Sequence, residues 1–145
     1  MKNITLVFAA ILLTLLACNG EQKEQINTNN SNKENTIEVL DFYGTHRCIT
    51  CESIETNTQY TLETYFEEEL KSGEISFHLI NVDKKENYDI AEKFEATGTA
   101  LFLNVIIDHK ETIIDLTDFA FMKGKDKEVF SKELKLKIEN ELSKL

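Results

Sequence analysis

Two hydrophobic periods alternate along the chain after its first quarter, and each change of period marks a predicted element. Short β-prone runs predict four strands at Ile37–Tyr43, Ile75–Val82, Ala100–Ile107 and Glu111–Leu116. Apolar residues that recur every three or four positions predict three helices, at Cys48–Ser72, Tyr88–Ala96 and Asp126–Leu142. The first run is mostly apolar and suits a strand that is covered on both faces.

The order of these elements is β-α-β-α-β-β-α. Alternating strands and helices predict a parallel start with right-handed crossovers. A tight turn at Asp108-His109-Lys110 predicts that the last two strands form a hairpin. We therefore expect an α/β fold with a central, mixed four-stranded sheet, in which Ser72-Gly73 ends the first helix and residues Thr117 to Lys125 are irregular.

The first residues predict a secretory signal peptide. Lys2 precedes an apolar stretch of about a dozen residues that ends in a small residue. The stretch is shorter than the roughly 20 residues that span a bilayer comfortably. Leu15-Leu16-Ala17-Cys18 resembles the lipobox of bacterial lipoproteins, and this resemblance implies that Cys18 carries the lipid anchor. An uncleaved anchor helix is the alternative, and both hold the domain at a membrane outside the cytoplasm.

The next segment changes composition sharply. Asn, Glu, Gln, Lys and Ser dominate from Asn19 to Asn35, where Ile26 is the only strongly apolar residue. Such a sequence cannot bury a core and is typical of a disordered tether. The expected organisation is a lipoprotein signal peptide over residues 1–17, a lipidated cysteine and tether over 18–35, and one folded domain over 36–145.

Composition suits a globular domain and excludes one class of partner. The chain is 41% hydrophobic and 29% charged, with a formal net charge of −10 and only 16 Lys and Arg residues. Nucleic acid is not an expected partner, because phosphate binding needs a basic face. The sequence contains no serine–histidine–acid set, phosphate loop or HExxH motif, so we expect no cofactor.

The candidate chemistry lies in a pair of cysteines. The chain has three cysteines, and a lipid on Cys18 leaves Cys48 and Cys51 as a pair. Their Cys-x-x-Cys spacing at a strand-to-helix junction is typical of a redox-active disulfide. Free N–H groups at the helix start favour a thiolate on Cys48, the predicted nucleophile. Cys51 lies one turn inward and is the predicted resolving thiol.

Two basic residues precede the pair. His46 and Arg47 either add positive charge beside the thiolate or point into water, and the sequence leaves both open. Zinc is the competing chemistry, and it requires about four ligands, usually in two clusters. No second Cys-x-x-Cys or His-x₃-His is present, so no metal is predicted. His78 and His109 are expected to be structural or solvent-facing.

From Val39 to about Leu142 the chain resembles the thioredoxin superfamily, on Asp41-Phe42-Tyr43 and Asn81-Val82-Asp83. The segment Phe42–Glu55 also resembles a narrower family, the nitrophenyl-compound nitroreductase subunit found with permeases that export aromatic arsenicals. The residues that fit its signature are Gly44, Arg47, Cys48, Thr50, Cys51, Ile54 and Glu55. The resemblance implies a thioredoxin-like fold.

The chain departs from ordinary thioredoxins at three places. Arg47 replaces the usual Trp, and Ile49-Thr50 replaces the usual Gly-Pro between the cysteines. The chain contains no proline, and the position of the expected cis-proline falls near Ala100. A non-proline cis bond costs about 2.5–4 kcal/mol, so we expect a trans bond there. General exchange with protein disulfides is therefore less well supported.

Three functions fit these features. The leading one is a membrane-anchored, extracytoplasmic thiol–disulfide oxidoreductase or electron-relay subunit, which receives electrons from a membrane dithiol-relay protein and passes them to an unknown redox substrate. The second, implied by the narrower resemblance, is a reductase subunit for nitroaromatic arsenicals. The third is a non-enzymatic lipoprotein whose dithiol binds a soft metal or an arsenical, since thiolates favour soft ions.

Overall fold

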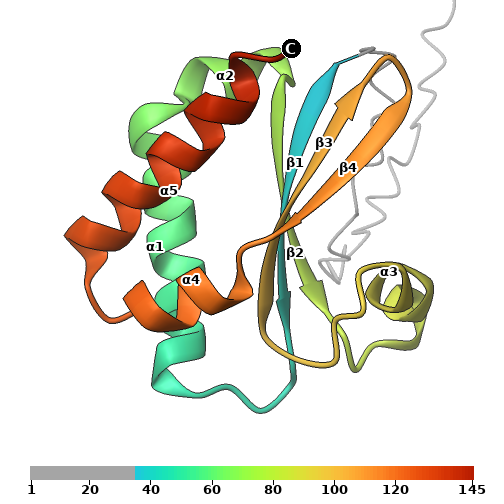
Figure 1. Ribbon diagram of the computed structural model, residues 1–145. Coiled ribbons are helices and arrows are strands. Elements are labelled where there is room, and N and C mark those ends of the chain that lie inside the picture. Colours follow the sequence, from blue (N-terminus) through green and yellow to red (C-terminus); the bar gives the residue numbers. More distant parts are fainter. Residues whose placement is uncertain (1–34) are drawn as a thin grey trace, which may run out of the picture. The chain divides into compact units, whose positions relative to one another are not determined.

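The computed structural model describes residues 35–145, so the predicted signal peptide, Cys18 and almost all of the predicted tether lie outside the described residues. Its strands are β1 (Thr36–Tyr43), β2 (Ile75–Asn81), β3 (Ala100–Ile107) and β4 (Lys110–Asp115). Its helices are α1 (Ile49–Tyr65), α2 (Glu67–Ser72), α3 (Tyr88–Lys93), α4 (Thr117–Lys123) and α5 (Lys127–Leu142), with a 3₁₀ turn, η1 (Lys85–Asn87), before α3 (Figure 1). Within this part of the chain, no helix is both long and apolar enough to cross a membrane.

The four strands form one mixed sheet in the order β2-β1-β3-β4. The central strand β1 pairs in parallel with β2 and antiparallel with β3. β3 and β4 form the predicted hairpin, and its turn residues Asp108 and His109 have positive φ angles of 50° and 63°. The predicted α/β fold with a central mixed sheet is therefore confirmed.

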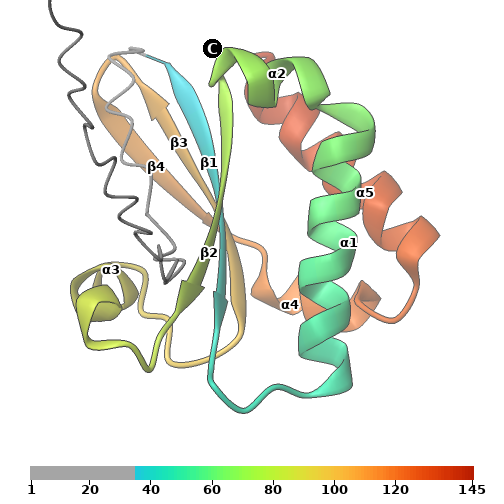
Figure 2. The ribbon, with the colours of Figure 1, turned by 180° about the vertical axis from the view of Figure 1, so that it is seen from behind.

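Helices cover both faces of this sheet. In Figures 1 and 2, α1, α2, α4 and α5 lie on one side and α3 lies on the other. β1 supplies both layers, because Val39 packs into the core cluster on the side of α1 while Leu40 packs into the cluster on the side of α3. The smaller cluster contains three phenylalanine rings whose centroids lie 5.4–5.7 Å apart, from Phe42, Phe94 and Phe102.

The prediction of one continuous helix to Ser72 was wrong. The helix breaks at Phe66, whose φ and ψ are −134° and 30°, and α2 begins after it. Phe66 is buried in the main core cluster and Leu70 packs against the same cluster, so the break accompanies tertiary packing on both sides of it. Gly73 ends α2 with a positive φ of 76°, as the sequence predicted.

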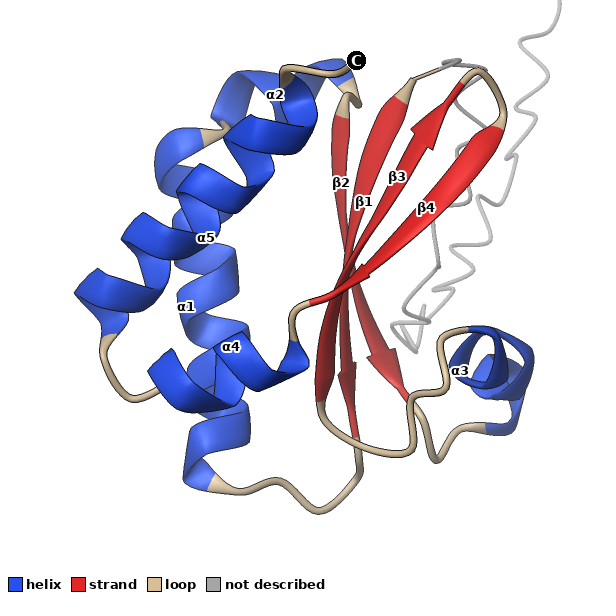
Figure 3. Cartoon of the chain, in the orientation of Figure 1, coloured by secondary structure: helices blue, strands red, loops and turns tan. Residues whose placement is uncertain are grey.

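The prediction that residues Thr117 to Lys125 are irregular was also wrong, because α4 occupies most of them (Figure 3). The carboxylate of Asp115 accepts a hydrogen bond from the backbone N–H of Thr117 at the start of this helix. Phe119 and Ala120 are buried in the core and fix the helix against the sheet. On α5, Leu136 was predicted on the apolar side but is 56% exposed.

The end of α4 is held tightly against α1. Asn57 of α1 donates a hydrogen bond to the carbonyl oxygen of Gly124 at 2.9 Å. A Cβ atom on Gly124 would lie 2.7 Å from the backbone oxygen of Ala120, 3.0 Å from Ile54 and 3.4 Å from the Thr50 methyl group. Only glycine allows this approach, which places the turn after α4 beside the residues between the two cysteines.

Candidate redox site

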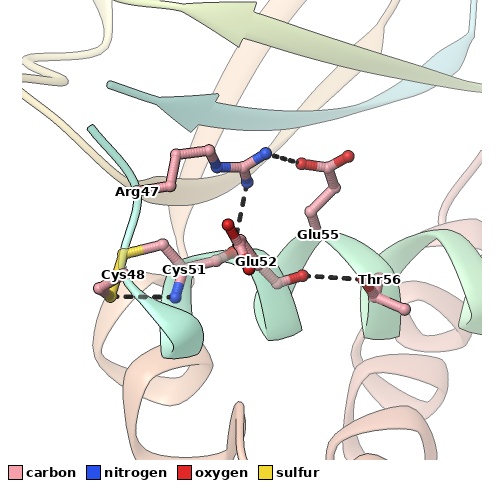
Figure 4. A network of polar contacts seen from close by, with 6 residues as sticks. All are labelled: Arg47, Cys48, Cys51, Glu52, Glu55 and Thr56. Carbon is pink, nitrogen blue, oxygen red and sulfur yellow. Dashed lines mark hydrogen bonds and ion pairs between the residues drawn. A yellow bond between two sulfur atoms is a disulfide. The ribbon is translucent and has the colours of Figure 1, made fainter. Parts of the chain in front are cut away.

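Cys48 and Cys51 form a disulfide at the start of α1, with their Cα atoms 5.1 Å apart (Figure 4). Cys48 is exposed and is the N-cap residue of the helix, where its Sγ atom accepts a hydrogen bond from the N–H of Cys51 at 3.2 Å. Cys51 is only 9% exposed. One sulfur is therefore open to a partner, and the other is shielded one turn inside the helix.

The turn after β2 fixes the loop that leads to Cys48. The carboxylate of Asp83 accepts a hydrogen bond from the backbone N–H of Thr45 at 2.6 Å, and Val82 donates to the carbonyl oxygen of Tyr43 at 2.9 Å. The hydrogen bonds from Thr45 hold the pKa of Asp83 below its usual range, and the charge of His46 acts in the same direction. His46 itself is exposed.

Arg47 lies along the first turns of α1 instead of extending into water. Its guanidinium forms an ion pair with Glu55 and also donates to the backbone carbonyl oxygen of Cys51 at 3.4 Å (Figure 4). The guanidinium carbon lies 4.6 Å from the centre of the Tyr43 ring. The side chains of Arg47 and Glu55 are only 19% and 23% exposed. A negative charge thus accompanies the positive charge expected beside the disulfide.

Asp41 was missed as a site residue by the sequence analysis. It lies in β1, is fully buried, and neither of its carboxylate oxygens has a hydrogen-bond partner. The pKa of Asp41 is raised to about 7, mainly by burial and also by the negative charge of Glu55, while Arg47 opposes both effects. The available signal was a single carboxylate inside a run expected to be covered on both faces.

His78 and His109, which were predicted to be structural or solvent-facing, lie apart from the disulfide. His78 on β2 shares a hydrogen bond with Ser76 at 2.9 Å. His109 lies in the β3–β4 turn, at the end of the sheet where β1 begins, whereas the disulfide follows the end of β1. Among the described residues, no group of three or more His, Cys, Asp or Glu side chains is placed to hold a metal ion. The peptide bond before Ala100 is trans, as expected.

Comparison with known proteins finds similarity in structure alone, since no family model and no curated protein matches the chain. The thioredoxin of Fasciola hepatica is 23% identical, with 65% of this chain and 81% of that chain covered and a TM-score of 0.42. The oxidized mitochondrial thioredoxin 3 of Saccharomyces cerevisiae is 27% identical, with 63% and 78% covered and a TM-score of 0.41. Thioredoxin-2 of a malaria parasite is 21% identical, with 67% and 89% covered and a TM-score of 0.40.

The fold is identified from the arrangement of strands and helices in this chain. A sheet in the order β2-β1-β3-β4 is flanked by helices on both faces, and the disulfide follows the central strand at the start of α1. The fold is thioredoxin-like. An exposed cysteine at a helix N-cap and a shielded second cysteine one turn inside the helix make up a site that can carry out thiol–disulfide exchange.

Replacing Asp41 by Asn should stabilise the oxidised protein at neutral and alkaline pH. Because the folded pKa is raised from 3.8 to about 7, the folded state binds more protons than the unfolded state between these values. Stability is therefore lost as the pH rises from about 4 to about 7. At about 1.4 kcal/mol per pH unit, the ionised carboxylate costs roughly 4 kcal/mol above pH 7. Urea unfolding from pH 4 to pH 8 measures this difference.

The matched control is Asp83→Asn. Asp83 is exposed and its pKa is lowered, so its hydrogen bonds stabilise the fold above its unfolded pKa, and this contribution is lost as the pH falls. We expect Asp83→Asn to lower stability at pH 7, the opposite sign to Asp41→Asn. A gap between Asp41→Asn and the wild type that stays constant across the pH range would contradict the burial argument.

Proposed function

We propose that this protein is a membrane-anchored thiol–disulfide oxidoreductase that acts outside the cytoplasm through Cys48 and Cys51. One observation carries the proposal: the two cysteines form a disulfide in which Cys48 is exposed and Cys51 is buried. This asymmetry separates the two chemical steps, because a partner reaches only the outer sulfur. The buried thiol then reacts only within the chain.

The cycle in the reducing direction has two steps. The Cys48 thiolate attacks one sulfur of a substrate disulfide, which forms a mixed disulfide and releases the first substrate thiolate. The Cys51 thiolate then attacks the Cys48 sulfur, which releases the second substrate thiolate and closes the Cys48–Cys51 disulfide. Two electrons pass from the protein to the substrate, and the N–H of Cys51 and the start of α1 favour negative charge on Cys48 in the first step.

The proton of Cys51 must leave before the second step. Asp41 is a suitable acceptor, because burial raises its pKa to about 7 and both of its oxygens are free of hydrogen bonds in the described structure. A base works best when its pKa is near the working pH. Arg47 lowers the pKa of Asp41 and also donates to the carbonyl oxygen of Cys51.

Anchoring and electron supply complete the proposal. The sequence Leu15-Leu16-Ala17-Cys18 supports a lipid on Cys18, and the polar segment after it supports a short tether. Outside the cytoplasm, repeated reduction needs electrons that cross the membrane. A membrane protein that relays dithiols is the proposed donor.

A redox titration of the full-length chain tests the oxidoreductase. Thiol alkylation should show Cys48 and Cys51 interconverting together as a two-electron couple between roughly −120 and −320 mV. Cys51→Ser should accumulate a mixed disulfide on Cys48 that is not resolved, and Cys48→Ser should form none. Absence of interconversion in this range, with stoichiometric binding of a soft metal ion by the dithiol, would favour the non-enzymatic binding protein instead.

Substitution of the predicted lipidated cysteine tests the anchoring. Cys18→Ser should move the chain from the membrane fraction to the soluble fraction and abolish labelling by a radioactive fatty acid. Cys48→Ser is the matched control, because it removes a cysteine and should leave both unchanged. If Cys18→Ser stays in the membrane fraction, the lipid anchor is wrong.

The narrower resemblance favours one class of substrate. Arg47 and Glu55 both belong to that signature, and they are the two residues that form the ion pair beside the disulfide. We propose nitroaromatic arsenicals as the final electron acceptors of a reductase in which this chain is the dithiol subunit. A host strain carrying Cys48→Ser should lose resistance to a nitrophenyl arsenical to the same degree as a strain without the protein. Unchanged resistance would remove this substrate class and leave the oxidoreductase intact.

A further inference from the structure

Arg47 links three parts of the site through one side chain. The guanidinium carbon lies 4.6 Å from the centre of the Tyr43 ring at the end of β1. One terminal nitrogen pairs with Glu55 in the second turn of α1, and the other donates to the carbonyl oxygen of Cys51 at 3.4 Å. Figure 4 shows the side chain lying along α1, with Glu55 reaching from the helix to meet it. The end of the strand, the loop before Cys48 and the first turns of the helix are therefore joined.

The two cysteines differ in how firmly the fold holds them. Cys51 is buried in the first turn of α1, whereas Cys48 is the exposed N-cap residue at the end of a loop. The carboxylate of Asp83 holds the middle of this loop through the N–H of Thr45. The side chain of Arg47 holds its last part against the helix. Loss of the Arg47 contacts should therefore loosen the exposed sulfur relative to the buried one.

The partners of the guanidinium indicate that Arg47 acts through geometry. Glu55 supplies a compensating negative charge, and both terminal nitrogens have partners other than sulfur. The sulfur of Cys48 accepts instead from the N–H of Cys51 at 3.2 Å. The start of α1 thus favours a thiolate on Cys48, and Arg47 acts on that residue through the position of the loop.

We propose that Arg47 is a positioning residue, which clamps the loop before Cys48 against α1 and keeps the Cys48 sulfur within reach of Cys51. Glu55 and Tyr43 are the anchors of this clamp. The inference rests on the proposed oxidoreductase function and adds what sets the equilibrium of its dithiol couple. Two groups that are held in alignment react as if each were present at a very high concentration. The clamp therefore favours the closed disulfide over the open dithiol.

Exchange with glutathione measures this equilibrium. The Cys48 thiolate of the reduced protein attacks oxidised glutathione, which forms a mixed disulfide and releases one glutathione thiolate. The Cys51 thiolate then attacks the Cys48 sulfur, which closes the protein disulfide and releases the second glutathione thiolate. The protein loses two electrons and oxidised glutathione gains them. Loss of a clamp lowers the equilibrium constant for closure, whereas loss of a positive charge that stabilises the Cys48 thiolate raises it.

The experiment equilibrates the full-length chain, in a Cys18→Ser background, with mixtures of reduced and oxidised glutathione at pH 7 and counts free thiols by alkylation. We expect Arg47→Gln to lower the equilibrium constant for closure about tenfold, which raises the reduction potential by about 30 mV. Arg47→Lys keeps the charge but lacks the planar fork that reaches Glu55 and Cys51 together, so we expect a lower constant here too. An unchanged or higher constant in Arg47→Gln, or a wild-type constant in Arg47→Lys, would overturn the proposal.

Variants at Glu55 test whether the contacts act as one unit. Glu55→Gln removes the ion-pair partner and should lower the constant in the same direction as Arg47→Gln. The double variant should lie close to Arg47→Gln alone, because the pair is already broken. Glu67→Gln breaks the exposed ion pair with Lys71 on α2 and should leave the constant unchanged. A double variant whose effect equals the product of the two single fold-changes would mean that the residues act independently, against the clamp.

A second readout does not depend on turnover. In a Cys51→Ser background, which cannot close the disulfide, the N–H of Glu52 reports on the helix start, since it donates to the carbonyl oxygen of Cys48 at 3.0 Å. We expect its hydrogen exchange to quicken about tenfold in Arg47→Gln. The N–H of Leu116, which donates to a carbonyl oxygen of β3 at 2.8 Å, should keep its rate. Equal quickening at both sites would mean general destabilisation, and this result or an unchanged Glu52 would refute the clamp.

The two readouts separate this proposal from the proposed function. A wild-type chain that does not exchange disulfides with glutathione would refute the oxidoreductase. Hydrogen exchange at Glu52 would then decide alone whether Arg47 clamps the loop.

Discussion

Burial of β1 on both faces is the constraint from which the site follows. The strand lies between β2 and β3 in the sheet and supplies side chains to the core on each side. The carboxyl end of the strand therefore fixes where the next loop begins. Asp83 holds this loop by accepting a hydrogen bond from Thr45. From there α1 starts after Cys48, its N-cap residue, so the position of the disulfide is fixed by a strand that is buried on both faces.

The same burial gives Asp41 its chemistry. Its environment lacks hydrogen-bond donors to its oxygens, and a charged carboxylate there is costly. Such a residue in a central strand lowers stability as the pH rises through its raised pKa. Local destabilisation of this kind concentrates at functional sites, where a pKa must match the working pH. Ionisation of Asp41 at neutral pH thus costs the fold stability, and an Asn at this position would not ionise.

Local sequence patterns were enough to locate the strands, the helix that carries the cysteines and the disulfide itself. The run at Ala100–Ile107 and the spacing of Cys48 and Cys51 are properties of adjacent residues. The break at Phe66 and the helix α4 depend on tertiary packing against the core. A short stretch of sequence does not contain that information. Arg47 and Glu55 are eight residues apart across a helix start, so their pairing could not be read from periodicity.

The charges that act on Asp41 come from Glu55 on α1 and from Arg47 in the loop that leads to Cys48. Its neighbours in β2 and β3 are leucines, so the sheet itself supplies no cation. Arg47 is joined to Cys48 by one peptide bond and donates to the carbonyl oxygen of Cys51. Its guanidinium also forms the ion pair with Glu55 on the same helix. The loop before the exposed cysteine and the backbone of the buried cysteine are thus held by the same side chain.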